Sequence, residues 1–174
     1  MFKGFGEPVA CGAGRPAFYA TVALDGLSVL SNSGIWIDDD GTAATPVVSV
    51  AQEGAPAPGT AGAVFHGFSS LAGLDSATEG PVFVARLRSG VGGVDTTNNV
   101  GIWARCNDGV VRKLIRTGET LSVGGQPKVV RSIQALLNLP GSSGQARTYV
   151  NAGSITYLVT FAGGTQAIVQ TTIP

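Results

Sequence analysis

The chain has 174 residues, of which 44% are hydrophobic and 13% are charged, so it is long enough to bury the core of one domain. Eleven basic and eleven acidic residues give a net charge of zero, which argues against binding to nucleic acid or to an anionic membrane surface. No apolar run reaches the roughly 20 residues that a membrane-spanning helix requires, and the first residues do not have the form of a signal peptide.

The sequence repeats itself with a period of about 65 residues. The motif Phe-x-Gly-Phe begins at Phe2 and again at Phe65, and the motif Gly-Ile-Trp begins at Gly34 and again at Gly101. A third, degenerate copy begins near Val130. We therefore expect a single domain made of copies at about residues 1–64, 65–129 and 130–174.

Each copy contains short apolar runs with a period of two residues, which predicts strands rather than helices. The first copy is expected to form strands over residues 2–9, 17–24, 34–37 and 46–52. The second is expected to form strands over residues 65–71, 81–87, 100–105 and 110–116. In the third copy, only residues 129–137, 154–161 and 167–172 are expected to form strands. Prolines between residues 53 and 59 predict a stiff, extended crossing from the first copy to the second.

These strands predict an all-β fold of about three four-stranded antiparallel repeats, arranged like the blades of a propeller. A three-sheet β-prism is the alternative, since closed propellers have about 4–8 blades. The aromatic residues expected to pack between the sheets are Phe18, Trp36, Phe83, Trp103, Tyr157 and Phe161. The strand count leaves the last sheet with an unpaired edge, and exposed edges recruit further strands. A homo-oligomer, or a place in a longer repeat array, is the expected assembly.

Residues 11–22, which read CGAGRPAFYATV, resemble the pattern N-x-x-G-x-x-A-F-x-A-x-L, with Cys11 in place of its Asn. Together with the Gly-Ile-Trp strand and residues 50–59, this segment is similar to C-terminal repeats of tandem-repeat proteins from environmental bacteria. Those proteins are predicted to be secreted, often carry a C-terminal sorting or anchoring segment, and have no known function. The resemblance implies an extracellular or cell-surface location, and it supplies no catalytic residue.

The one carboxylate cluster is Asp38, Asp39 and Asp40, followed by Gly41. Several oxygens close together suit Ca²⁺, but the spacing of an EF-hand loop and its distal Glu are missing. A hairpin turn is the favoured interpretation, since Asp and Gly are common turn residues. No other cofactor is indicated.

Trp36 and Trp103 would stack on a sugar if their rings were exposed, but their equivalent repeat positions favour a place in the core. His66 is the only histidine, so any Ser-His-Asp triad must use it, and a histidine zinc site is excluded by number. Cys11 and Cys106 are compatible with a disulfide or with two buried free thiols, and we favour the thiols.

The sequence thus favours an extracellular structural or protein-binding repeat module without catalysis, which self-assembles through strand edges. A carbohydrate-binding module or polysaccharide-active hydrolase is the first alternative, and exposed tryptophans beside a carboxylate pair would support it. A subunit of a surface layer or filament is the second alternative.

Overall fold

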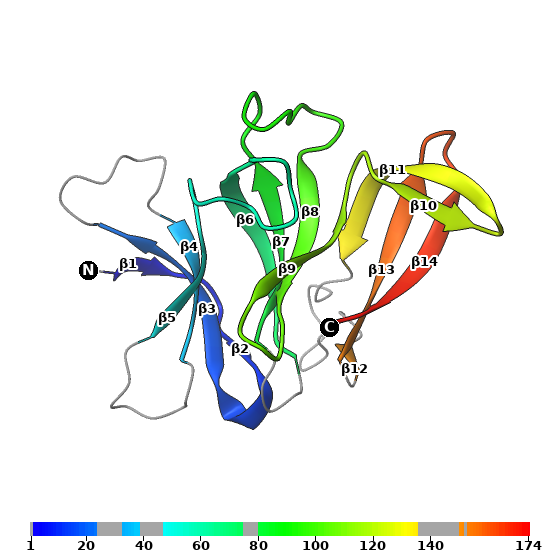
Figure 1. The fold of residues 1–174 in the computed structure, drawn as a ribbon. Helices are drawn as coiled ribbons and strands as arrows, with labels where there is room; N and C mark the ends of the chain where they lie inside the picture. Colours follow the sequence, from blue (N-terminus) through cyan, green and yellow to red (C-terminus); the bar gives the residue numbers. More distant parts are fainter. Residues whose placement is uncertain (1, 24–32, 39–46, 75–79, 136–149, 152) are drawn as a thin grey trace.

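The computed structural model describes residues 2–23, 33–38, 47–74, 80–135, 150–151 and 153–174. These residues form three antiparallel sheets (Figure 1), and their one helical element is a 3-10 turn at Gly12–Gly14. The expected all-β fold of repeated antiparallel sheets is confirmed.

In sheets 1 and 2 the main strands follow the order of the chain. Sheet 1 consists of β1 (Phe2–Phe5), β3 (Pro16–Val22), β4 (Ser33–Ile37) and β5 (Val48–Gln52), with β2 (Val9–Ala10) also paired to β3. Sheet 2 consists of β6 (Phe65–Ala72), β7 (Val82–Leu87), β8 (Val100–Arg105) and β9 (Val111–Arg116).

Sheet 3 departs from this plan. It contains β10 (Thr120–Val123), β11 (Gln126–Ala135), β12 (Val150–Asn151), β13 (Ser154–Phe161) and β14 (Gln166–Thr172). Strands β11, β13 and β14 take the first three places of a repeat, while β10 forms a hairpin with β11. In the described part of the chain, no strand takes the fourth place beside β14.

The connection between sheets 1 and 2 corrects one expectation. Instead of crossing in an extended form, it folds back on itself: the Ala57 N–H donates to the Ala63 carbonyl at 2.8 Å, and Pro56 forms a bridge with Val64. Gly59 adopts a φ of 73°, which reverses the chain there at no steric cost. The prolines therefore form part of a turn rather than a spacer.

The Gly-Ile-Trp motif has a steric explanation. Residues two apart on a strand share a face, and the Trp103 indole lies directly over Gly101. A Cβ on Gly101 would come within 2.8 Å of both the indole ring and the Ile115 carbonyl oxygen. The same contact recurs in sheet 1, where a Cβ on Gly34 would lie 2.8 Å from the Trp36 ring. The glycine is required because the indole occupies the space that a side chain would fill.

Sheet 2 packs both of its faces. One face places Phe65, Phe83 and Trp103 against Ile35 and Ala51 of sheet 1. The opposite face packs a different set of residues from sheets 2 and 3 together, including Val82, Ile102, Ala104, Ile155, Tyr157 and Phe161. None of the core clusters formed by the described residues joins sheet 1 to sheet 3, and Figure 1 shows sheet 2 between them. The sheets therefore stack in sequence, as propeller blades do.

The expectation that all six aromatic residues pack between sheets is wrong for two of them. Ile35 and Ile37 of β4 face sheet 2, so Trp36 between them faces away. Phe18 is the cross-strand partner of Trp36 and lies on the same outer face. Equivalent positions in the repeats thus have different surroundings, because sheet 1 is at one end of the stack.

Two glycine substitutions test this account of the motif. Gly101→Ala should destabilise the chain by about 1–3 kcal/mol, because the methyl group must displace a backbone oxygen or the indole. Gly67→Ala should leave stability unchanged or raise it slightly, since a Cβ there meets nothing within 4 Å and glycine weakens a strand interior. Urea denaturation measures both. Equal effects of the two substitutions would contradict the steric explanation.

Candidate functional site

Both tryptophans are buried. Trp103 is fully enclosed, and its Nε1–H donates to the Pro58 carbonyl at 3.0 Å. Trp36 is 7% exposed, with Phe2 and Phe18 packed around its ring. Stacking on a sugar needs an accessible ring face, which neither residue offers in this arrangement.

Only part of the acidic cluster lies in the described chain. Asp38 follows β4, and its backbone N–H donates to the Pro16 carbonyl at 3.0 Å. Asp39 and Asp40 lie outside the described residues. Among the residues that are described, no group of three or more His, Cys, Asp or Glu side chains is placed to hold a metal ion.

The matching turn in sheet 2 shows what an aspartate does at such a position. Asp108 accepts hydrogen bonds from the Val110 N–H at 3.0 Å and from both terminal nitrogens of Arg112, at 2.8 and 2.5 Å. The hydrogen bond from Arg112 holds the pKa of Asp108 well below its usual range. This carboxylate closes a hairpin turn, which is an ordinary structural role for Asp beside Gly.

His66 lies beside a carboxylate, but not in the order that catalysis requires. Its Nδ1 is 3.6 Å from Glu53 Oε1, while Glu53 Oε2 accepts a hydrogen bond from the Ser33 hydroxyl at 2.8 Å. A catalytic triad needs the histidine between the hydroxyl and the acid, so that it can take the proton. Here the acid lies in the middle, and it links the beginning of β4 to the first strand of sheet 2.

Glu119 occupies the corresponding connection between sheets 2 and 3. It accepts a hydrogen bond from the backbone N–H of Arg116 at 3.0 Å and forms an ion pair with Lys113. Glu53 and Glu119 therefore each bind groups of their own connection. Neither is held beside a second carboxylate in the contacts that we observe, which a glycosidase-type acid pair would require.

Cys11 and Cys106 are both free and buried. Cys11 packs with Ala17 and Ile37, and Cys106 belongs to the core between sheets 2 and 3. Burial raises the pKa of the Cys11 thiol, which keeps it in the unreactive protonated form at neutral pH. The two residues fill the core as small apolar side chains do.

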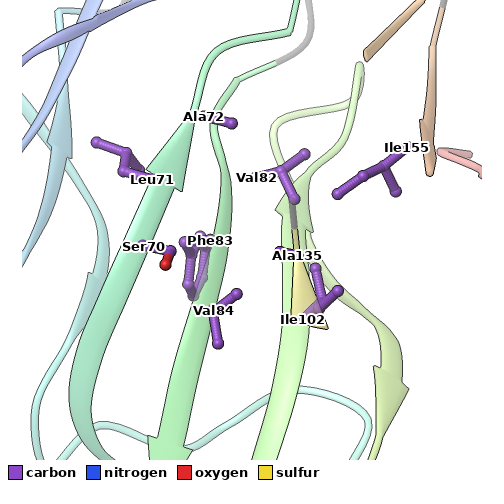
Figure 2. A pocket seen from close by; sticks show the side chains of 9 residues that line it. All are labelled: Ser70, Leu71, Ala72, Val82, Phe83, Val84, Ile102, Ala135 and Ile155. Carbon is purple, nitrogen blue, oxygen red and sulfur yellow. The ribbon is translucent and has the colours of Figure 1, made fainter. Parts of the chain in front are cut away.

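An apolar hollow lies beside sheets 2 and 3 (Figure 2), with an empty volume of about 190 Å³ that includes open solvent. Val82, Phe83, Val84 and Ile102 line it from β7 and β8, and Ala135 and Ile155 line it from sheet 3. Ser70 carries the only side-chain polar group of this lining. Binding sites for small molecules combine apolar walls with several convergent polar groups, which this hollow lacks.

The outer face of sheet 1 carries an aromatic quartet of Phe2, Phe5, Phe18 and Trp36. It reproduces the aromatic quartet of sheet 2, which consists of the buried Phe65, Phe83 and Trp103 and the partly buried Phe68. The ring centroids of the stacked pair are 6.4 Å apart in both sheets. The edge contact between the first Phe and the Trp measures 5.2 Å in sheet 1 and 5.1 Å in sheet 2. Yet Phe5 is 66% exposed, so no part of the described chain covers this quartet as sheet 1 covers the quartet of sheet 2.

The second open feature is the free edge of β14. In sheet 3 the Phe161 N–H donates to the Thr165 carbonyl, and the Ile173 N–H donates to the Gly153 carbonyl. Hydrogen-bonded and non-hydrogen-bonded pairs alternate along an antiparallel ladder. The register therefore directs the backbone groups of Gln166, Ile168 and Gln170 away from β13, toward the free edge.

Comparison with known proteins places the chain in a family. The family model described as "Family of unknown function (DUF7453)" matches residues 1–174, and the chain belongs to this family. No curated protein matches it. No solved structure matches it either. No helix in the described part of the chain is long and apolar enough to cross a membrane.

The buried thiols give a direct test of the core. In denaturant without reductant, a thiol-reactive chromophore should titrate two thiols per chain, because both cysteines are free. In the native protein both should react slowly, since burial excludes the reagent and keeps Cys11 protonated. The variant Cys106→Ser should titrate one thiol in denaturant. A native-like chain without titratable thiols in denaturant would indicate a disulfide and contradict this description.

Proposed function

We propose that this chain is an extracellular structural or binding repeat module, without catalysis, that accepts a strand from a protein partner at the free edge of β14. The unfilled fourth place of sheet 3 carries the proposal. Sheets 1 and 2 both fill that place, with β5 and β9, whereas β14 pairs only with β13 among the described strands. The chain itself thus contains two examples of the strand that would fit.

Backbone groups supply most of the affinity in such strand addition, and alternate side chains supply the specificity. The partner strand would lie beside β14 as β9 lies beside β8, where Ile102 is opposite Ile115 and Trp103 is opposite Lys113. A second copy of the chain is one source of this strand, which would make the module a homo-oligomer. An exposed edge without Pro or charge in its centre favours pairing of this kind.

The proposed location outside the cell, or on its surface, has separate support. The chain has few charges and a net charge of zero, and its repeat pattern resembles that of bacterial proteins predicted to be secreted. The residues that a catalytic interpretation would use are engaged in turns and connections, as Glu53, Asp108 and Glu119 illustrate. This supports a role in structure or binding.

A peptide of residues 109–118 (GVVRKLIRTG), which contains the fourth strand of sheet 2, tests the proposal. Labelled with a fluorophore, it should bind the chain saturably, with a rise in anisotropy, because it fills the fourth place beside β14. The variant Gln170→Pro removes a backbone N–H that points to the free edge and leaves the bonds to β13 in place. It should bind the peptide at least about threefold more weakly, since one hydrogen bond contributes about 0.5–1.5 kcal/mol.

Gln170→Ala is the matched control, because it also removes the side-chain hydrogen bond to Ser154 but keeps the backbone N–H. It should bind the peptide as the unchanged chain does, and a scrambled peptide should not bind. Equal binding by the Pro variant and the Ala variant, or no binding by the unchanged chain, would overturn the proposal.

A further inference from the structure

We infer that the aromatic face of sheet 1 binds the outward face of sheet 3 from a second copy of the chain, with β14 of one copy against β1 of the other. The inference rests on the proposed role as a protein-binding module, but it concerns sheet faces rather than the edge of β14. The two sheet-on-sheet contacts within the chain serve as its templates.

Both internal contacts follow one rule. The third strand of one sheet packs against the first strand of the next, as β4 does against β6 and β8 does against β11. The isoleucine of each Gly-Ile-Trp motif faces the following sheet, and Ile35 and Ile102 are both 0% exposed. Each copy thus offers an isoleucine on its third strand to the sheet that follows it.

Sheet 3 also has an isoleucine on its third strand, but no sheet follows it among the described residues. In its register Ile168 is opposite Leu158, as Ile102 is opposite Val84 and as Ile35 is opposite Tyr19. Ile168 is therefore the isoleucine of the third copy. It is 75% exposed, more than any other large hydrophobic side chain in the described part of the chain.

The opposite end of the stack has the matching surface. Inside the molecule, Ile35 packs in one cluster with Phe65, Phe83 and Trp103, which belong to the aromatic quartet of sheet 2. The quartet of sheet 1 has the same ring arrangement, and Phe5 is the second most exposed large hydrophobic side chain of the described residues. One end of the chain therefore presents the isoleucine, and the other end presents the aromatic surface that receives it.

A second copy of the chain is the partner that supplies both surfaces. Two chains together have six sheets, and this number lies within the range of about 4–8 blades found in closed propellers. The three sheets of one chain are too few. A head-to-tail contact that closes into a ring uses both ends of each chain and leaves no end free. On β13 and β14, the side chains that share the outward face with Ile168 carry no charge, so these two strands bring no ion into the contact: Thr156, Leu158, Thr160, Gln166 and Gln170.

The solution mass of three chains tests this inference, by light scattering over a dilution series. The unchanged chain should be a dimer, and Phe5→Asp and Ile168→Asp should each be monomeric, because each places a carboxylate in the contact. An equimolar mixture of the two variants should form dimers again. In that mixture, Ile168 of the Phe5→Asp chain still meets Phe5 of the Ile168→Asp chain, so one of the two contacts remains intact.

Val110→Asp is the matched control, since Val110 is an exposed apolar residue in a turn of sheet 2, and this variant should remain a dimer. Circular dichroism of each variant should show the β spectrum of the unchanged chain. Dimers of Ile168→Asp would overturn the inference in favour of contact between two aromatic faces. If Gln170→Pro is monomeric while Phe5→Asp and Ile168→Asp remain dimers, the inference is overturned, and the dimer forms through the edge of β14 instead.

A monomer at every concentration would also overturn the inference. The proposed function would then still be tested by the peptide experiment, because peptide binding does not require self-association of the chain. Conversely, failure of the peptide to bind, together with a dimer that Phe5→Asp and Ile168→Asp both abolish, would retain the inference and reject the strand-edge proposal.

Discussion

The contact of one sheet face with the next is the interaction on which the whole chain depends. A four-stranded sheet of about 25 residues cannot bury its own apolar side chains, so each repeat needs a neighbour. The contact has a fixed direction, because the isoleucine of each Gly-Ile-Trp motif faces forward and the tryptophan faces backward along the stack. This direction makes the two ends of the stack different from each other. It explains why sheet 1 covers the aromatic quartet of sheet 2, whereas no described sheet covers the quartet of sheet 1.

The polar chemistry of the chain serves the connections between sheets. Glu53 joins Ser33 to the neighbourhood of His66, and Glu119 binds backbone and side-chain donors at the next connection. In the first two repeats a carboxylate thus fastens the connection to the sheet that comes before it. Among the described residues, no group of three or more His, Cys, Asp or Glu side chains is placed to hold a metal ion.

Most of the fold could be predicted from the sequence, because period-two patterns and a repeat of about 65 residues report on local structure. Strand β13 matches its expected range, and the pattern alone predicts three strands in the third copy, where each of the other copies has four. The folded connection at Pro56 was not predictable in this way, because its turn depends on a glycine φ and on contacts with the neighbouring strand. The outward position of Trp36 was missed because equivalence in sequence was taken to mean that the same neighbouring sheet covers each copy. The repeat alignment already contained the signal: within these 174 residues, no copy of the repeat comes before the first one, so its aromatic face has no counterpart of the sheet that covers the second.

The third copy has an isoleucine at the register position of the two earlier Gly-Ile-Trp motifs, although it lacks most of the aromatic residues of that pattern. Val169 replaces the tryptophan opposite Tyr157, whose hydroxyl is 2.7 Å from that of Thr171, so a polar contact forms part of the interior edge of this sheet. Ile168 nevertheless lies in the register position of the two earlier isoleucines, with Leu158 opposite it and threonine and glutamine beside this pair. Two apolar side chains, Leu158 and Ile168, within an otherwise polar face of β13 and β14 limit nonspecific aggregation and still allow a specific partner to gain from burying them. A surface of this composition is suited to a contact that forms with one matching face and dissociates from others.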